Sequence, residues 1–572
     1  MSKNLGHLAT TGSQMAFART KFEVDDARVQ ARREGAAVPT NGTTRRADFD
    51  HDVGRRHLVP MHPADQSRIE HTLTSLATQS VSTPAVIDGA RSWSYSATAA
   101  MVATNAARLR AHGLSPGDRV LIFLDKSIES VVALYAVWTV GAIAVPANEG
   151  LHSRQLRHLL DDSGAALLVS NARKLARLDP ATTVGVDHME IDIDARGTAA
   201  LAFAPAGNRP LGGGRVPAAI LYTSGSTGRP KGILISHANL IAGARIVAGY
   251  LGMRCDERVL SVLPFSFDYG LNQLLTTVMV GATLVLQRSH FPPDICRSLL
   301  AQRITLMAGV PALWIQLMDR HSPYQGMAFP ELRILTNSGG AFPDGLVDRY
   351  RTHLPHARIF LMYGLSEAFR STFLPPELID RKPGAMGKAI PETEVFVLAT
   401  GDSGAAARLC ADGEPGELVH RGPTVALGYW RNPEATAERF RPDPFAPGSG
   451  ETVVFSGDVV QRDAEGFLFF VGRRDQLIKT QGFRVSPEEV EEILYASGMV
   501  TEAAVCGVAD ASGDTAIVAH VVLADLPDFS ADSLLAFCRR EMPSYMVPKM
   551  VRRHASLPHT GSGKIDRKAL AQ

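Results

Sequence analysis

Apolar runs typical of buried strands alternate with amphipathic stretches along most of the 572-residue chain. From about Pro63 to the 470s these runs include "AALLVS", "AAILYT", "ATLVL", "LRILTNSGG" and "ARIFLMYG". Such alternation favours helix-covered parallel sheets, because a helix supplies the crossover connection that parallel strands need. The pattern therefore predicts an α/β fold of layered subdomains. In such sheets ligands bind where strands end and glycine-rich loops begin.

The character of the chain changes after the 470s. A Ser-Pro-x-Glu sequence beginning at Ser486 combines a cap, a first-turn proline and a capping-box glutamate, which predicts a helix start. The strand candidates "AAVCGVAD" and "AIVAHVVLA" and the helix candidate "ADSLLAFCRREM" follow. We therefore expect a large N-terminal domain over residues 61–474 and a mobile, smaller α+β domain over 475–572. Residues 1–60 are polar, show no sustained apolar period and are expected to be a disordered extension.

Charge and cysteine content disfavour several classes of protein. Lysine and arginine number 59 against 58 for aspartate and glutamate, so the net charge gives no reason to expect nucleic acid as a partner. The five cysteines are scattered without CxxC spacing, which disfavours a disulfide framework or a zinc site. The N-terminal sequence "MSKNLGHLATTGS" lacks the apolar core of a signal peptide. We therefore expect a reducing, cytoplasmic location.

The most membrane-like run is "VVALYAVWTVGAIAVPA", residues 131–147, interrupted by Gly141 and Pro146. It is slightly short for a membrane span. With "DRVLIFL" before it, the segment is typical of a buried strand, a helix from Ser127, and a second strand. We therefore predict a buried β-α-β unit and no integral membrane span.

The stretch "LYTSGSTGRPKG", residues 221–232, links a predicted strand to the helix candidate "SHANLIAGARIVAGYL". Its glycines let a ligand approach the backbone, and its hydroxyls, amides and Lys231 can surround phosphate oxygens. A mobile surface loop is the alternative interpretation. A Walker A motif is excluded, because Lys231 follows Pro230 and precedes Gly232.

The loop resembles the phosphate-loop signature of the AMP-forming adenylating superfamily, which includes acyl-CoA synthetases, luciferases and peptide-synthetase adenylation domains. Further stretches resemble that family's motifs in the family's order: "NSGGAF" (337–342), "MYGLSE" (362–367), "GELVHRGPTVALGYWRNPEAT" (416–436), "FSGDVVQRDAEGFLFFVGRRDQLIKTQGFRVSPEEVE" and "TGSGKIDRKAL" (560–570). The resemblance covers about Asp65 to Gln572. Six motifs in one order make coincidence an inadequate explanation.

The resemblance implies activation of a carboxylic acid by ATP and Mg²⁺. A carboxylate is a poor acyl donor, and joining it to AMP brings an anionic nucleophile to an anionic triphosphate, so the site must neutralise charge and align the attack. The implied ATP or AMP contacts are Thr223, Ser224, Gly225, Ser226, Thr227, Gly228, Lys231, Gly339, Gly340, Tyr363, Gly364, Ser366, Asp458 and Arg473. Among these, the residues from 223 to 231 would hold the β- and γ-phosphates and Tyr363 would pack on adenine. Ser366 would contact the α-phosphate, and Asp458, assisted by Arg473, the ribose.

By the same resemblance, Lys564, Lys231 and Glu367 form the catalytic set. Lys564 would bridge the substrate carboxylate and the α-phosphate, and Glu367 would ligate Mg²⁺, a cation suited to carboxylate and phosphate oxygens. Three of the implied site residues have a purely structural alternative: a solvated tail lysine for Lys564, a helix-start carboxylate for Glu367 and a turn aspartate for Asp458.

Asp475 resembles the family's hinge residue, about which the small domain swings between an adenylating and a thioester-forming pose. The swing would withdraw Lys564 and bring Lys479 and Gly482 to the site for thiol attack. Such gating is physically reasonable, because Mg-pyrophosphate must leave before the thiol enters. A salt bridge in a loop is the alternative role of Asp475.

The acid pocket is expected between residues 263–275 and 362–373, with Phe267, Asp268, Gly339 and Gly364 lining it. Asp268 lies where amino-acid-activating relatives use an aspartate to pair the substrate ammonium. A buried aspartate without a charged partner is costly, which favours a cationic substrate. However, "NSGGAF" lacks the Gly-Gly-Glu of peptide-synthetase relatives and resembles the acyl-CoA branch, and Asp268 could bond backbone amides instead.

No carrier domain follows Lys564 in this sequence, so the thiol acceptor, CoA or a separate phosphopantetheinyl carrier protein, is expected in trans. Three functions fit the sequence. The first is a ligase that forms an acyl-AMP and then a thioester. The second is a stand-alone amino-acid adenylating enzyme that loads a carrier protein. The third is a catalytically silent binding or scaffold homologue, which has no chemical need for Lys231, Glu367, Asp458 and Lys564 together.

Overall fold

The computed structural model describes residues 68–79, 83–193, 215–223, 230–342, 344–399, 407–473, 478–480, 483–509, 515–524, 530–542, 546–560 and 564–570. The expected extension over residues 1–60 lies outside these ranges and stays a prediction, as does the domain boundary at 474 and 475.

One sheet of the N-terminal part is built mainly from parallel strands. Its spatial order is β18 (Gly428–Tyr429), β8 (Lys231–Ser236), β7 (Pro217–Thr223), β4 (Ile143–Pro146), β3 (Arg119–Ile122), β5 (Leu167–Val169) and β6 (Asp187–Met189). The run from β7 to β6 is parallel, whereas β8 pairs antiparallel with both β7 and β18. This parallel run confirms the α/β prediction.

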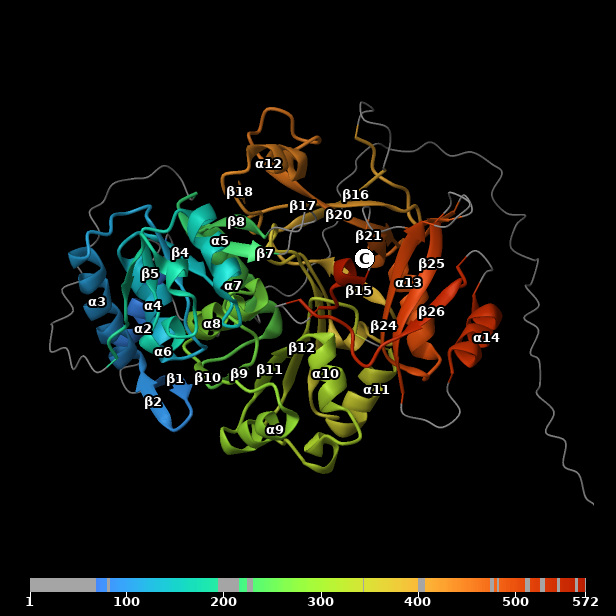
Figure 1. Cartoon of the computed structure of the whole chain (residues 1–572), viewed down its shortest axis with the longest axis horizontal. Coiled ribbons are helices and arrows are strands. Elements are labelled where there is room, and N and C mark those ends of the chain that lie inside the picture. The colour runs from blue at the N-terminus through green and yellow to red at the C-terminus, as the bar shows by residue number, and fades with distance from the viewer. Residues whose placement is uncertain are drawn as a thin grey trace, which may run out of the picture. The chain divides into compact units, whose positions relative to one another are not determined.

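A larger sheet combines a parallel and an antiparallel part. Its order is β16 (Glu394–Leu398), β17 (Gly416–Arg421), β20 (Thr452–Arg462), β21 (Leu468–Arg473), β15 (Ala385–Ala389), β14 (Thr372–Leu374), β13 (Arg358–Tyr363), β12 (Ile334–Asn337), β11 (Leu306–Gly309), β9 (Arg258–Ser261), β10 (Thr283–Leu286), β1 (Pro84–Asp88) and β2 (Arg91–Ser94), with β19 (Phe440–Pro442) on β20. The strands from β13 to β1 are parallel, and the remaining pairs are antiparallel. In Figure 1 the blue β1 therefore lies beside the green β10, although the two strands are far apart in the chain.

Helices lie before or between these strands and share their cores. They are α2 (Glu70–Gln79), α3 (Tyr95–Ala111), α4 (Ile128–Thr139), α5 (Ser153–Ser163), α6 (Ala172–Leu175), α7 (His237–Leu251), α8 (Asp268–Val280), α9 (Pro292–Ala301), α10 (Pro311–Leu317), α11 (Asp344–His353) and α12 (Pro433–Arg439), with short 3₁₀ turns η2 (Pro180–Thr183), η3 (Pro323–Gly326) and η4 (Pro376–Leu378). Helix α3 packs on α4, and α7 packs on α8. One cluster of buried apolar side chains runs through all four of these helices.

The membrane-like run forms the predicted strand-helix-strand unit. Strands β3 and β4 are parallel neighbours, and α4 connects them with nearly every side chain buried. The helix ends before Gly141, whose φ of +82° is a conformation that glycine adopts without strain. Burial by protein on all sides explains why the helix is apolar all round. Among the described helices none is both long and apolar enough to cross a membrane.

The C-terminal part has its own sheet and core. Strands β24 (Val500–Ala509) and β25 (Thr515–Leu523) are antiparallel, β26 (Met550–Arg553) joins β25 in parallel, and β22 (Ile478–Thr480) pairs with β23 (Phe483–Val485). The helices are α13 (Pro487–Ala496), α14 (Ala531–Glu541) and α15 (Arg567–Leu570), and Figure 1 draws α13, α14 and this sheet in orange to red. Their buried residues form a cluster separate from those of the N-terminal part. The predicted small α+β unit is thereby confirmed.

Candidate functional site

The phosphate-loop candidate connects two antiparallel strands. Thr223, the last residue of β7, lies opposite Lys231, the first residue of β8. The predicted contacts Ser224, Gly225, Ser226, Thr227 and Gly228 lie outside the described residues. Strand β8 stands between the loop and α7, where the sequence indicated a helix alone. The hairpin holds both ends of the loop at one position of the sheet.

Lys231 and Glu367 are linked through Tyr429, a residue of the "GYW" stretch. The Tyr429 hydroxyl donates a 2.6 Å hydrogen bond to Glu367 Oε1. Lys231 Nζ lies 5.6 Å from the centre of the Tyr429 ring. Burial, followed by the nearby Glu367 charge, raises the pKa of Tyr429, so the phenol stays protonated and donates. This arrangement fixes one carboxylate oxygen of Glu367.

A second group of side chains consists of Tyr363, Asp458 and Arg473. Tyr363 and Arg473 end their strands, and Asp458 lies within β20. Asp458 of β20 lies opposite Arg473, the last residue of β21, and Arg473 Nε lies 3.3 Å from Asp458 Oδ1. The Tyr363 hydroxyl, at the end of β13, donates to Asp458 Oδ2. Desolvation raises the pKa of Asp458, and Arg473 and the tyrosine hydroxyl oppose the shift. The carboxylate that the sequence assigned to ribose is thus buried but has two partners.

The glycines after β12 and β13 leave space beside functional side chains. Gly339 has a φ of +83°, and a Cβ atom there would lie 3.7 Å from Lys564 Cε and 3.8 Å from Phe267 Cζ. A Cβ atom at Gly364 would lie 3.2 Å from Arg370 Cα. Gly340 is exposed and Ser366 half-buried. The parallel strands therefore bring the predicted adenine-side loop next to Phe267 and Lys564.

Lys564 reaches the group of carboxylates from the C-terminal part of the chain. The residue as a whole is exposed, yet its Cε lies close to Gly339. Desolvation of the ammonium lowers the pKa of Lys564, and the charge of Asp268, followed among the carboxylates by Asp458, opposes that shift. The charges of the acid-pocket aspartate and of the ribose-site aspartate therefore both stabilise the protonated ammonium of Lys564.

The acid-pocket aspartate has a charged partner in the protein itself. Asp268 begins α8 and is 4% exposed, and Arg370 is 2% exposed. Arg370 Nη1 lies 3.7 Å from Asp268 Oδ2, and the guanidinium lies 4.6 Å from the centre of the Tyr269 ring. Burial raises the pKa of Asp268, while Arg370 and Lys564 oppose the shift. The argument that a buried aspartate without a charged partner favours a cationic substrate therefore does not apply here, because Arg370 is a charged partner of Asp268.

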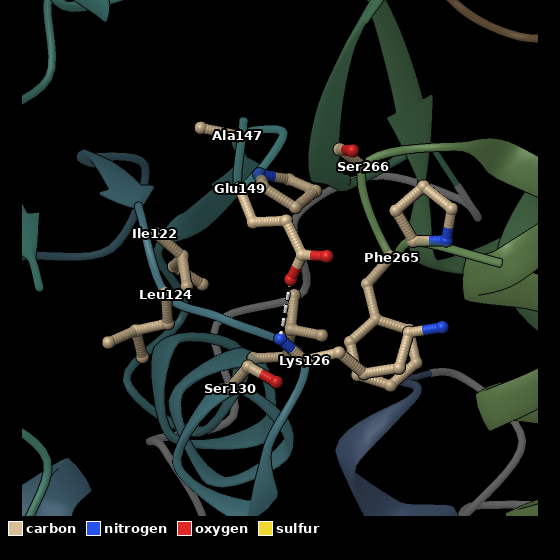
Figure 2. Close-up of a pocket in the computed structure, with 11 residues that line it drawn as sticks. Ile122, Leu124, Lys126, Ser130, Ala147, Glu149, Phe265 and Ser266 are labelled. Carbon is tan, nitrogen blue, oxygen red and sulfur yellow. Dashed lines mark hydrogen bonds between the residues drawn. The ribbon is translucent and has the colours of Figure 1, made fainter. Parts of the chain in front are cut away.

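A small cavity of about 20 Å³ lies behind the loop that leads from β9 to α8 (Figure 2). Phe265 and Ser266 of that loop line it, together with Lys126 and Glu149. Lys126 Nζ donates to the carbonyl oxygen of Ser261 at 3.0 Å, and its backbone nitrogen donates to Glu149 Oε2 at 2.9 Å. Burial lowers the pKa of Lys126 to about 7. These contacts hold the start of the loop that ends at Phe267 and Asp268.

Tyr429, Arg370 and Lys126 were not singled out from the sequence. Tyr429 lies inside the stretch 416–436 that carried the family resemblance, and Arg370 lies inside the range 362–373 expected to border the acid pocket; these are the only sequence signals they offer. Lys126 is a single lysine in "LDKSIES", and nothing in that pattern distinguishes it from a surface lysine.

The predicted hinge and thiolation face are only partly described. Asp475 and Gly482 lie outside the described residues, and Lys479 is placed through its backbone, opposite Arg484 in the β22–β23 pair. Their roles stay predictions. In the part of the chain that the structure describes, no group of three or more His, Cys, Asp or Glu side chains could hold a metal ion. Glu367 supplies a carboxylate, one of the oxygen ligands that Mg²⁺ prefers.

Comparison with known protein families gives two matches. A family model described as AMP-binding enzyme matches residues 73–430, and one described as AMP-binding enzyme C-terminal domain matches residues 489–564. These matches contain Lys231, Glu367 and Lys564. They also divide the chain between the large and the small part seen in the structure.

Individual relatives fall into two groups. Feruloyl-CoA synthase from Amycolatopsis sp is 34% identical over 487 residues, covering 84% of this chain and 94% of that protein. Bacitracin synthase 3 from Bacillus licheniformis is 30% identical over 467 residues, which is 81% of this chain but 7% of that protein. This chain thus spans less than a tenth of the length of the bacitracin synthase.

Among solved structures, O-succinylbenzoate coenzyme A synthetase from Bacillus subtilis in complex with ATP and magnesium ion superimposes with a TM-score of 0.73 at 25% identity. The match covers 88% of this chain and 99% of that structure. The fold is therefore shared over nearly the whole of that enzyme.

Proposed function

The chain belongs to the AMP-binding enzyme family, and on this basis we propose that it is an AMP-forming acid–thiol ligase. In the first step an oxygen of the substrate carboxylate bonds to the α-phosphorus of ATP. The bond to the bridging oxygen of the β-phosphate breaks, and pyrophosphate leaves. In the second step a thiolate attacks the acyl carbon, AMP leaves, and a thioester forms.

The observation that carries the proposal is the position of Lys564 beside Gly339, where the charges of Asp268 and Asp458 stabilise its ammonium group. A cation here is suited to neutralise the carboxylate and the α-phosphate as they approach one another. Its partial desolvation strengthens that interaction, because charges attract more strongly where water is excluded.

The other groups are assigned by charge and position. The amides and hydroxyls of residues 223–228, with Lys231, would hold the β- and γ-phosphates, and Gly340 and Ser366 would contact the nucleotide. Tyr363 would pack on adenine, while Asp458 would accept the ribose hydroxyls. Glu367, oriented by Tyr429, would hold Mg²⁺, which supplies charge neutralisation of the phosphates when bound.

The acceptor thiol and its binding face belong to the same proposal. We assign Asp475 as the hinge and Lys479 with Gly482 as part of the thiolation face, with CoA as the acceptor. One relative that this chain covers almost completely is a feruloyl-CoA synthase, which favours CoA over a carrier protein. A cytoplasmic location agrees with an ATP-dependent reaction and with five free cysteines.

A second candidate is an amino-acid adenylating enzyme that loads a carrier protein in trans. The position of Asp268 and the bacitracin synthase match favour it. The Arg370 partner of Asp268 disfavours it, because an ammonium group would enter a pocket that already holds two cations, Arg370 and Lys564. The silent-homologue alternative predicts ATP binding without pyrophosphate release.

The proposed function is tested by ATP–pyrophosphate exchange with Mg²⁺ and a panel of fatty, aryl and amino acids. We expect one class of acid to drive exchange, and Lys564→Ala to lower the rate by roughly 100- to 1,000-fold with little change in ATP affinity. Lys549→Ala, which removes an exposed lysine of the same part of the chain, is the matched control. Normal exchange in Lys564→Ala, or ATP binding without exchange for any acid, would exclude the proposal.

A further inference from the structure

We propose that the acid pocket selects a carboxylic acid whose acyl part carries a second oxygen acceptor, a hydroxyl, oxo or second carboxyl group, and that Arg370 binds this oxygen. The inference rests on the proposed function, because it names the substrate class of the same site. Its evidence is a set of buried hydrogen-bond donors that have no partner among the described residues.

Arg370 is buried with most of its donors unused. Its guanidinium has five N–H groups. The Asp268 carboxylate is 3.7 Å from Nη1, which is an ion-pair distance beyond hydrogen-bond range. Nε and Nη2 are buried, and no hydrogen-bond partner for them is present among the described residues. A buried donor left unpaired is destabilising, so a ligand oxygen that accepts from these groups is stabilising.

Asn272 adds a second donor near the same segment. It lies one helical turn after Asp268, so both side chains are on one face of α8. Asn272 is 2% exposed, and its Nδ2 also has no partner in the described part of the chain. Gly243 lies next to both Asn272 and Phe369, the residue before Arg370. A Cβ atom at Gly243 would lie 3.7 Å from Asn272 Nδ2 and 2.4 Å from the Phe369 ring. The unpaired nitrogen atoms of Arg370 and Asn272 are all donors, which defines the missing group as an acceptor.

The backbone around Arg370 is held in an unusual conformation. Phe369 has a φ of +49°, in the left-handed region that bulky residues avoid. The Phe369 ring is fully buried and fits against the α7 backbone only because residue 243 is glycine. Such local strain is typical of positions where a side chain is held for binding. Here it directs the following residue, Arg370, to Asp268 and the Tyr269 ring.

Charge balance favours an oxygen-bearing group over an ammonium group on the substrate. The Asp268 charge is matched by Arg370, and the substrate carboxylate itself is matched by Lys564 in the proposed reaction. An added ammonium would meet two cations, and a plain hydrocarbon would leave Arg370 and Asn272 unpaired. A site built to bond a polar group discriminates strongly against an analogue that lacks it. A neutral hydroxyl or oxo group and a second carboxylate share the required acceptor chemistry.

The inference is tested by calorimetric titration of the full chain, loaded with Mg²⁺ and α,β-methylene-ATP, which blocks turnover. The ligands are two matched series: hexanoate, its 3-hydroxy, 5-oxo, ω-carboxyl and ω-amino derivatives, and benzoate with its 3-hydroxy, 3-carboxyl and 3-aminomethyl derivatives. We expect at least one oxygen-bearing acid to bind about 10- to 100-fold more tightly than its unsubstituted parent. Comparing the affinities of the hydroxy and oxo derivatives with that of the carboxyl derivative then identifies which group supplies the acceptor oxygen.

Arg370→Met removes the donors and keeps the chain length, and we expect it to reduce this preference to about equal affinity. Because this variant leaves Asp268 buried and unpaired, Asp268→Asn/Arg370→Met is measured beside it. Arg303→Met, at a side chain that is 74% exposed, is the control. Equal affinities across each series, no measurable binding of any acid, tightest binding of an ammonium-bearing acid, or a preference that survives in both Arg370 variants would each overturn the inference.

The two proposals fail separately. If the oxygen-bearing acids bind with the expected preference but drive no pyrophosphate exchange, the ligase proposal is wrong and the pocket assignment stands. If unsubstituted acids drive exchange as well as their oxygen-bearing counterparts, the ligase proposal stands and the pocket assignment is overturned.

Discussion

The Tyr429 hydroxyl donates a 2.6 Å hydrogen bond to Glu367 Oε1, while the ring of the same tyrosine lies 5.6 Å from Lys231 Nζ. One side chain thus contacts both the carboxylate assigned to Mg²⁺ and the lysine assigned to the phosphates. Strand β18 places it there, because Tyr429 pairs with Ile233 of β8, two residues after Lys231. Tyr429 is therefore a positioning residue of the proposed site.

Tyr429→Phe removes this hydrogen bond and keeps the ring beside Lys231. Groups that orient metal ligands typically contribute 10- to 100-fold to metal affinity or activity. We expect the Mg²⁺ concentration for half-maximal pyrophosphate exchange to rise about 10-fold, with little change in the free energy of unfolding. The measurement is a Mg²⁺ titration at saturating ATP and acid. An unchanged Mg²⁺ midpoint would show that the hydrogen bond does not orient the metal ligand.

Asp458→Asn keeps the shape of the side chain and removes its charge. The Asn amide nitrogen cannot accept from Tyr363 or from a ribose hydroxyl, and the attraction to Arg473 is lost. Hydrogen bonds to charged groups contribute about 1.5–3 kcal/mol, so we expect the KM for ATP to rise roughly 10- to 100-fold. Steady-state exchange at varied ATP measures this. Asp412→Asn, at an exposed ion pair with Arg462, is the control and should leave the KM unchanged.

Gly270 allows the first turn of α8 to approach the loop that carries Phe267. A Cβ atom at Gly270 would lie 2.1 Å from the carbonyl oxygen of Pro264, which is backbone and cannot rotate away. We therefore expect Gly270→Ala to displace Asp268, to weaken acid binding at least about 10-fold, and to lower the free energy of unfolding by roughly 1–3 kcal/mol.

The matched control for Gly270 is Gly249→Ala, because Gly249 also lies in a helix and a Cβ atom there would meet nothing within 4 Å. That change should be neutral or stabilising by up to about 1 kcal/mol, since alanine favours helices over glycine. Urea denaturation and acid titration of both variants give the comparison. Similar losses in the two variants would indicate a general helix effect instead of the predicted steric clash.

Local sequence patterns were sufficient to predict elements whose burial follows a simple rule. The β3–α4–β4 unit was predicted because a run buried on all sides is apolar throughout, and α13 because Ser486 and Pro487 mark a helix start. Strand β8 was missed, since the glycines and proline before it indicated a loop leading to a helix. The antiparallel part of the large sheet was also not predicted, because strand order is set by tertiary packing and not by periodicity.

In the site, too, sequence patterns identified individual residues but not their tertiary contacts. The resemblance identified Lys231, Glu367, Asp458 and Lys564 as a set, but no local pattern indicates which side chains meet. Glu367 and Tyr429 are 62 residues apart, and they meet because β18 joins the edge of a sheet. The Arg370 partner of Asp268 was likewise missed, and with it the reason why burial alone does not require a cationic substrate.

His420 makes the stability of the site depend on pH. It is 3% exposed, both ring nitrogens are without partners in the described part of the chain, and its ring stacks near Tyr363. Desolvation lowers the pKa of His420 to about 3, whereas a histidine in the unfolded chain titrates near pH 6.5. Between about pH 6.5 and about pH 3 the unfolded chain therefore binds up to one proton more at this residue than the folded chain. The contribution of this residue is fully present above pH 6.5 and is lost by about 1.4 kcal/mol per pH unit as the pH falls towards about 3.

Replacing the ring with an apolar side chain should remove this dependence. We expect the unfolding free energy of His420→Leu to fall less steeply than that of the parent chain between about pH 6.5 and 4.5. The difference in slope should be about 1.4 kcal/mol per pH unit. Urea denaturation at several pH values measures both slopes. His356→Leu, at an exposed histidine, should keep the parent slope. Parallel curves for His420→Leu and the parent would mean that the buried ring is protonated or exposed before the chain unfolds, so that the linkage is not with global unfolding.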